Sequence, residues 1–223
     1  MTEIVTPPAK PVSFVSLPLV KLLAYLVSWF LFSLSLVLLV YAVQAVGSVG
    51  GTCASGNTAY VIQHPCPEAT NFLPWVVFSG LIAVGIGVGL ANGIGVQTRV
   101  WAWPILFGGL GLFFLAAGIF GGQLVGWIIG AMFIVMALVP LIIELRASVQ
   151  RVFLGSFDIF GNQFYEGPKA QPSFSSRRMP NPPDAIKPNA GAWAIALLGF
   201  AIPSVAGYFL ATAWVASIAA SQG

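Results

Sequence analysis

Long apolar runs separated by short polar stretches make up most of the chain. About 20 mainly apolar residues are needed for a helix to cross the hydrocarbon core of a bilayer. Each such run therefore predicts a transmembrane helix, and none carries a charged residue near its centre. The five runs are Leu22–Val46, Leu73–Leu90, Pro104–Phe120, Leu124–Ile143 and Gly191–Ser217. The pattern predicts an all-α, polytopic membrane protein with five transmembrane helices.

Two of these boundaries need separate attention. Only Gly121, Gly122 and Gln123 separate the third run from the fourth, so four spans with one re-entrant hairpin are the alternative. The first run follows Lys21 as a signal peptide would. However, its 25 residues exceed the roughly 7–15 of a cleavable hydrophobic region, which favours an uncleaved signal anchor.

The distribution of basic residues predicts the orientation. If the N-terminus is inside, the inner segments are 1–21, 91–103 and 144–190, and the outer segments are 47–72, 121–123 and 218–223. The inner side then holds all nine basic residues of the chain: Lys10, Lys21, Arg99, Arg146, Arg151, Lys169, Arg177, Arg178 and Lys187. By the positive-inside rule, the N-terminus is cytoplasmic and the C-terminus external in a multi-pass protein of the plasma (inner) membrane.

Tryptophan positions support the same orientation, because the indole ring favours the membrane interface. Under the predicted topology, six of the seven tryptophans lie near helix ends: Trp75, Trp127 and Trp214 on the outer side, and Trp101, Trp103 and Trp193 on the inner side. Trp29, inside the first helix, is the exception.

The overall composition agrees with a membrane environment. Hydrophobic residues make up 58% of the chain and charged residues 7%, against roughly 25% charged residues in soluble domains. The net charge of +3 comes from basic residues that form no stripe, which argues against nucleic-acid binding.

Glycines recur every four residues in two places. One series is Gly85, Gly89 and Gly93; the other is Gly118, Gly122, Gly126 and Gly130. This spacing puts small residues on one helix face, where a second backbone can approach closely. We expect these faces to pack helices, either within the chain or against the helix of a partner.

The predicted outer loop contains both cysteines of the chain, Cys53 and Cys66. An external position is oxidising, so a disulfide is expected. It would close a 14-residue loop and stabilise the fold by roughly 3 kcal/mol in the chain-entropy model. The sole histidine, His64, lies in the same loop and is expected to be an exposed polar side chain without a special role, with a pH-sensing or partner-contacting role as the alternative.

The apolar runs lack the side chains that membrane chemistry uses. They contain no histidine and no central charge, so we expect no cofactor, no metal site, no proton or ion pathway and no catalytic constellation. Glu144, near Arg146 at the inner end of the fourth run, is expected to form an interfacial ion pair rather than handle protons. The polar residues within the runs are Tyr25, Ser28, Ser33, Ser35, Tyr41, Gln44, Ser79, Ser204, Tyr208 and Thr212.

The long inner segment divides into an aromatic half and a proline-rich half. Phe153, Phe157, Phe160 and Phe164 have the spacing of an amphipathic interfacial helix, which Gly155 and Gly161 weaken in favour of a bent segment. Six prolines follow between residues 167 and 188. We expect this half to be a linker, or an arm on a partner or on anionic lipid, with Arg177 and Arg178 as the contacting residues.

The GGTCASGN…PCPE pattern of the outer loop resembles a family of small actinobacterial polytopic membrane proteins. Members carry a GTCASGG…PCP loop between their first two helices, and this chain has Asn57 where glycine is common. The match covers about a tenth of the chain besides the hydropathy plan. Some small helical proteins of this type are accessory subunits of the actinobacterial cytochrome bcc–aa3 respiratory supercomplex, and the resemblance implies such a role here.

We therefore expect a non-catalytic accessory subunit of a larger membrane complex, with membrane lipids and that complex as its partners. An autonomous oligomeric channel or small-solute permeation protein is the alternative, since uncharged pores exist. A membrane-embedded enzyme acting on lipid is disfavoured because no catalytic constellation is present.

Overall fold

The computed structural model describes residues 17–48, 66, 72–90, 102–122, 124–145, 149–165 and 183–221. Within these ranges lie the helices α1 (Pro18–Ser48), α2 (Leu73–Leu90), α4 (Ala102–Gly121), α5 (Leu124–Leu145), α6 (Val149–Leu154) and α7 (Ala190–Ser221). Only isolated β-bridges occur besides the helices in the described ranges, so the all-α prediction is confirmed there. Each of the five predicted runs falls inside one of the long helices.

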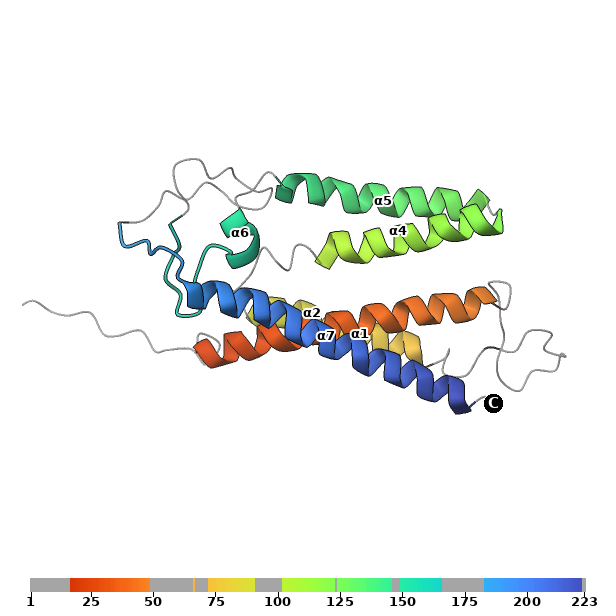
Figure 1. Cartoon of the computed structure of the whole chain (residues 1–223), viewed down its shortest axis with the longest axis horizontal. Helices are drawn as coiled ribbons and strands as arrows, with labels where there is room; N and C mark the ends of the chain where they lie inside the picture. The colour runs from red at the N-terminus through yellow and green to blue at the C-terminus, as the bar shows by residue number, and fades with distance from the viewer. Residues whose placement is uncertain are drawn as a thin grey trace, which may run out of the picture.

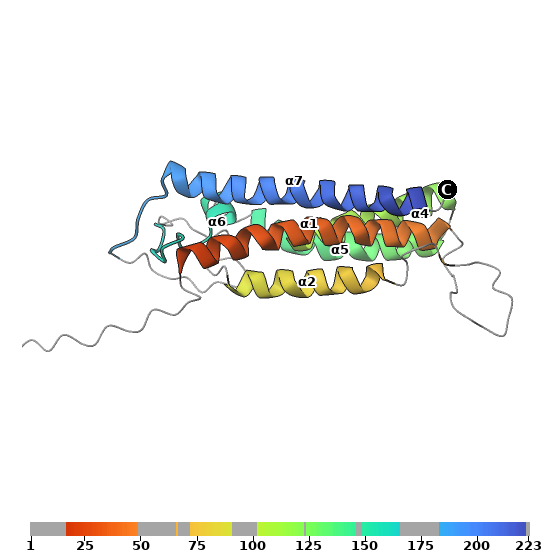
Figure 2. The same ribbon diagram turned by 90° about the horizontal axis from the view of Figure 1, so that it is seen from below.

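The long helices lie side by side along one axis of the molecule (Figure 1). α1, α4 and α7 begin at the same end, whereas α2 and α5 begin at the opposite end (Figure 1, Figure 2). Consecutive long helices therefore run in opposite directions, while α1 and α7, the first and the last, run parallel.

Three of the described helical stretches are long and apolar enough to cross a membrane: Pro18–Ala45, Ala102–Gly121 and Ala190–Ile218. The apolar stretches of α2 and α5 found among the described side chains, Leu73–Ala83 and Leu124–Val139, are shorter. The chain thus has helices suited to a membrane, and the number of five crossings stays a prediction.

Local chemistry accounts for where the helices begin. Pro18, Pro74 and Pro104 lie in the first turns of α1, α2 and α4, where the missing amide hydrogen breaks no helical hydrogen bond. α7 begins after Asn189, whose Oδ1 accepts a hydrogen bond from the Ala192 amide at 2.8 Å, as an N-cap residue does.

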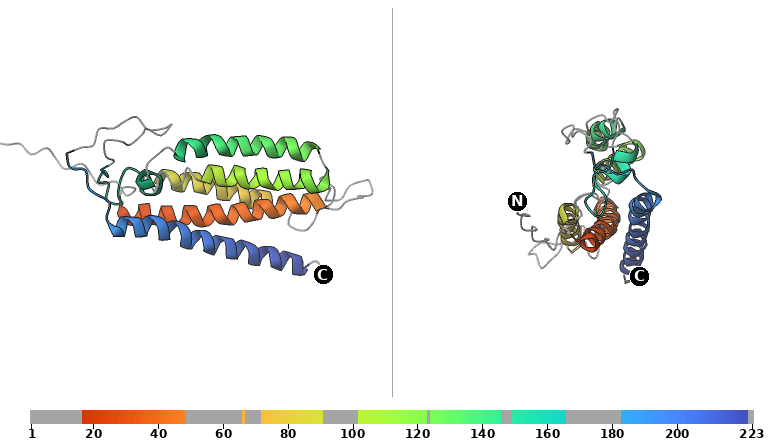
Figure 3. Two further views of the ribbon diagram at one scale, coloured as in Figure 1. Left: turned by 45° about the horizontal axis from the view of Figure 1, so that its top comes forward. Right: turned by 90° about the vertical axis from the view of Figure 1, so that its left-hand side faces the viewer.

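α1 is the central helix of a three-helix group, with α2 and α7 on two of its sides (Figure 3). Its N-terminal half contributes Tyr25, Trp29 and Phe32 to a buried cluster, and its C-terminal half contributes Leu34 and Leu38 to a second one. Trp29 is only 2% exposed and makes edge-on contact with Phe200 of α7 at 4.6 Å between ring centroids. The tryptophan that departs from the interface pattern is therefore a core residue.

The face of α7 that contacts α1 carries a row of small residues and one proline. Gly199, Pro203, Gly207 and Ala211 recur every four residues and are all buried. A Cβ added at Gly207 would collide with the Phe30 carbonyl oxygen and lie 3.1 Å from the Leu34 nitrogen, so the two backbones are in direct contact there. The Tyr25 hydroxyl donates to the Ala196 carbonyl at 2.9 Å and adds a buried polar link.

Within the α1–α2 contact, one small residue of each helix faces the other. Ser35 is fully buried, and its Oγ occupies the space that a Cβ of Gly80 would need. Gly85, five residues further along α2, has no atom within 4 Å of its Cβ position. A side chain at position 80 would therefore disturb the contact with α1, while the α2 face at Gly85 is open.

This difference predicts opposite outcomes for the same substitution on one helix. Gly80→Val should lower the free energy of unfolding by about 1–3 kcal/mol because the valine overpacks the contact with Ser35. Gly85→Val makes the same change in side-chain volume and helix propensity at an open position, and should leave stability within about 0.5 kcal/mol of wild type. Unfolding of the purified protein by denaturing detergent measures both values. Equal losses in the two variants would contradict the Gly80 contact.

Candidate functional site

The α4–α5 hairpin is the second packing unit of the chain, and glycines form its contact. A Cβ at Gly118 would lie 2.8 Å from the Trp127 nitrogen, and one at Gly126 would lie 2.8 Å from the Gly118 nitrogen. A Cβ at Gly130 would lie 2.7 Å from the Leu115 nitrogen. These positions join the two helices backbone to backbone, as small-residue motifs do in membranes.

Of the two expected roles, packing within the chain is the one observed for Gly118, Gly126 and Gly130, and the partner-packing assignment does not describe these contacts. Gly122 does not share their face, because it has a φ of 63°, lies between α4 and α5, and has nothing within 4 Å of its Cβ position. Of the first series, Gly85 is open to contact from outside the chain, whereas the side-chain surroundings of Gly89 and Gly93 lie outside the described residues.

A tryptophan also links α4 to α5. The Trp103 indole N–H donates to the Met136 carbonyl at 3.2 Å. In a regular helix this carbonyl would accept a hydrogen bond from residue 140, which is Pro140 and has no amide hydrogen. Because a backbone carbonyl without a partner is costly in hydrocarbon, Trp103 replaces the bond that the proline removes.

A double-mutant cycle tests this relation. Trp103→Phe should destabilise the protein by about 1 kcal/mol through loss of the hydrogen bond, while keeping an aromatic ring beside Phe107. In the Pro140→Ala background, Trp103→Phe should lower the free energy of unfolding clearly less, because the new amide of residue 140 can donate to the Met136 carbonyl. Unfolding free energies of the four proteins give the coupling, and an equal cost in both backgrounds would disprove it.

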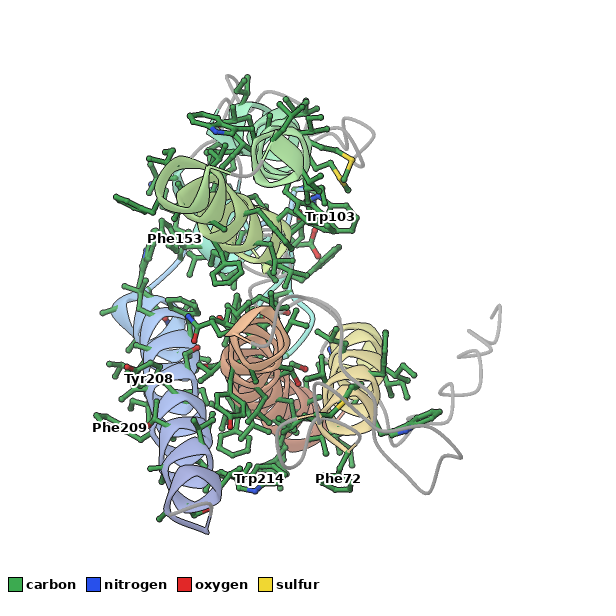
Figure 4. All side chains as sticks on the ribbon, turned by 90° about the vertical axis from the view of Figure 1, so that its right-hand side faces the viewer. Phe72, Trp103, Phe153, Tyr208, Phe209 and Trp214 are labelled. Atoms are coloured by element: carbon green, nitrogen blue, oxygen red, sulfur yellow. The ribbon has the colours of Figure 1, made fainter. Side chains whose placement is uncertain are left out.

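Near the beginning of α4, the hairpin contacts the aromatic cluster of α1. Ala102 and Leu106, in the first two turns of α4, pack against the Tyr25–Trp29–Phe32 cluster. Further along, large apolar side chains of the hairpin are exposed: Leu112, Ile119, Phe120, Leu124, Val125, Ile128, Met132, Val135 and Val139. Figure 4, which looks along the helices, shows the hairpin as a unit separate from α1, α2 and α7. Most of the apolar hairpin surface is thus not covered by the described part of the chain.

The aromatic segment of the inner loop is bent rather than helical. α6 ends at Leu154, and Gly155 and Gly161, with φ of 77° and 92°, turn the chain twice. The continuous four-phenylalanine helical stripe is therefore wrong, and the bent segment that the two glycines favoured is correct. Phe164 is 2% exposed against Ala196 of α7, whereas Phe160 is 73% exposed, so the aromatic residues do not share one face.

An aspartate that sequence reasoning did not single out organises this bend. Asp158 Oδ1 accepts from the Phe160 and Asn162 amides at 2.9 and 2.7 Å, and its Oδ2 accepts from the Asn162 side chain at 2.9 Å. The sequence Asp-x-x-Gly-Asn at residues 158–162 could have indicated this turn, because aspartate, glycine and asparagine are typical turn residues. Tyr165 then pairs with Ile186 through its amide at 2.9 Å, which ties the bend to the start of α7.

Removing the Asp158 carboxylate should open this bend without unfolding the helices. Asp158→Ala should speed hydrogen exchange of the Phe160 and Asn162 amides by about 10- to 100-fold, since bonds to a charged group contribute roughly 1.5–3 kcal/mol. Asp184→Ala removes an exposed carboxylate outside the bend and is the matched control. Exchange measured by mass spectrometry should be unchanged in the control. Exchange of these two amides as slow in Asp158→Ala as in the wild type would refute the role of Asp158 in holding the bend.

A pocket of about 250 Å³ lies between this bend and the first turns of α7. Apolar residues that line it include Leu154, Phe164 and Ala196, and the charged residues that line it are Asp158 and Lys187. The Asp158 oxygens are already hydrogen-bonded within the bend, so the pocket offers shape and apolar contact more than reactive groups.

The remaining predicted site residues are only partly described. Cys66 is disulfide-bonded, but Cys53 lies outside the described residues, so the pairing of the two stays a prediction. His64, Arg177 and Arg178 also lie outside them, as do the side chains of Glu144 and Arg146. Within the described part of the chain, no group of three or more His, Cys, Asp or Glu side chains could hold a metal ion.

Comparison with known proteins adds no assignment. No family model, curated protein or solved structure matches this chain.

Proposed function

We propose that this chain is a non-catalytic accessory subunit that stabilises a larger membrane complex by helix packing and loop contacts. The observation that carries the proposal is the apolar surface of the α4–α5 hairpin, which packs against the aromatic cluster of α1 through Ala102 and Leu106 and exposes large apolar side chains further along. Large contiguous apolar surface is typical of surfaces that meet lipid or a partner. Open Gly85 on α2 offers a second place for close helix contact.

The proposal includes five membrane crossings with a cytoplasmic N-terminus and an external C-terminus. The alternating helix directions support it (Figure 1). The described basic positions support it as well, because Lys21, Arg151 and Lys187 belong to α1, α6 and the residues preceding α7, at the end where α1 and α7 begin. This end is cytoplasmic by the positive-inside rule.

The respiratory cytochrome bcc–aa3 supercomplex is our candidate for the larger complex. Its support is the resemblance of the outer loop, which covers a small part of the chain. The proposed contacts need no residue-specific chemistry: small residues and apolar side chains against the partner's helices, a disulfide-closed loop outside, and a proline-rich arm inside with Arg177 and Arg178 toward the partner or anionic lipid.

Co-migration in native membranes tests the proposal. After gentle solubilisation, the 23.5 kDa chain should migrate with a much larger complex, whose members are identified by mass spectrometry. A chain that migrates alone would refute the accessory role. Solute flux through the purified protein in vesicles would favour the channel instead.

A pair of variants then separates partner contact from internal packing. Gly85→Leu should leave the unfolding free energy of the purified protein near wild type, yet reduce the co-migrating fraction about tenfold, equivalent to about 1.4 kcal/mol of contact. Ala206→Leu, at an exposed small residue of α7 outside the hairpin surface and the Gly85 face, should leave that fraction unchanged.

A further inference from the structure

A groove runs along the outer halves of α1 and α7. Its volume is about 610 Å³, within the range of roughly 300–1,000 Å³ typical of small-molecule sites. Apolar side chains line most of it, namely Leu36, Val37, Val40 and Val215. Polar side chains interrupt this lining, with Tyr41 and Gln44 toward the end of α1.

The groove begins where the two helices touch. At Gly207 the backbones are in direct contact, and its Cβ position lies 3.2 Å from the Ser33 Cβ, which closes the inner end. Beyond this point α1 and α7 diverge (Figure 1). Ser33 and Tyr208 line the closed end, and Tyr208 is half exposed on α7 (Figure 4).

The length of the groove matches one leaflet of a bilayer. From Ser33 to Gln44, eleven steps of 1.5 Å along α1 make about 16 Å. The hydrocarbon core of a bilayer is roughly 30 Å thick, so one leaflet is about half of that. The closed end thus lies near the membrane centre, and Tyr41 and Gln44 lie near the interface.

One residue of the groove lies beside the region that α4 contacts. Leu36 lines the groove and also packs against the Tyr25–Trp29–Phe32 cluster, as Ala102 and Leu106 of α4 do. All described residues that line the groove belong to α1 and α7, and none belongs to α4 or α5. The described part of the hairpin therefore leaves the groove free for an apolar occupant.

We infer that a phospholipid occupies this groove, with one acyl chain along Val37, Val40 and Val215 and its glycerol ester region beside Tyr41 and Gln44. Most of the lining side chains are large or branched, with Ser33 and Ala216 as the small ones, and no glycine lines the groove. Such a surface suits a flexible chain better than a partner's helix, which needs small residues along its contact. The Gln44 amide and Tyr41 hydroxyl provide hydrogen-bonding groups at the depth where lipid esters lie. The Thr212 hydroxyl is bonded to the Phe209 carbonyl at 3.0 Å and leaves the middle of the groove to apolar contact. This inference does not depend on the proposed accessory role.

Photo-labelling of the purified full-length protein tests it. The protein is placed in vesicles of phosphatidylcholine that contain a small fraction with a diazirine at mid-chain, and labelled peptides are mapped by mass spectrometry. Peptides containing residues 33–44 and 208–216 should be labelled about fivefold or more above those of the exposed α5 surface, which corresponds to a retained lipid rather than bulk contact. Uniform labelling of all exposed helices would overturn the inference.

Two substitutions sharpen the test. Val40→Trp fills the groove and should lower its labelling about fivefold, whereas Val27→Trp makes the same change on α1 at a half-exposed position outside the groove and should not. Gln44→Leu keeps the size of the side chain and should lower the phosphatidylcholine retained after detergent washing about fivefold, as seen by native mass spectrometry. If Val40→Trp does not fold, the labelling pattern of the wild-type protein and the lipid retention of Gln44→Leu still test the inference. Cross-linking of the groove to another polypeptide in native membranes, with no retained lipid, would also overturn the inference.

Discussion

Close approach of α2 and α7 to α1 is the constraint on which the rest of this structure depends. In a bilayer, burial of apolar side chains between helices gains little, because lipid is equally apolar. Association instead needs close approach, which Gly207 allows on the α7 side and Gly80 on the α2 side. With α1 held between these two helices, its aromatic cluster meets the first turns of α4 and thereby positions the hairpin.

The same constraint explains the positions of three polar groups in the described helices, which have a structural role. Ser35 fills the space beside Gly80, Tyr25 bonds the Ala196 carbonyl, and Trp103 bonds the carbonyl that Pro140 leaves without its helical partner. A charged group has such a role at the bend after α6, where the Asp158 carboxylate orders a turn outside the long helices.

Hydropathy was sufficient to predict the helices, because membrane crossing imposes length and apolarity on continuous segments. α2 begins and ends where its apolar run does, and α1 extends its run by a few residues at each end. Glycine spacing predicted close packing but not its partner: Gly118 and Gly126 face each other across the hairpin, and only the fold decides that. The α7 series was missed because Pro203 interrupts the glycines, and the groove could not be foreseen because it arises from the divergence of helices distant in sequence.

The parallel pairing of α1 with α7 has a consequence for biogenesis. The α4–α5 hairpin joins neighbouring segments through the short connection at residues 122–123 and can assemble as soon as both are synthesised. The face of α1 that packs against α7, in contrast, has no partner until α7 is synthesised. For example, the Ala196 carbonyl that accepts from the Tyr25 hydroxyl lies 171 residues after Tyr25. During insertion, α1 therefore exposes its Tyr25 hydroxyl and the surface that packs against the α7 glycines to lipid, or to insertion machinery, until α7 has been synthesised. Loss of α7 alone would leave this surface of α1 permanently exposed.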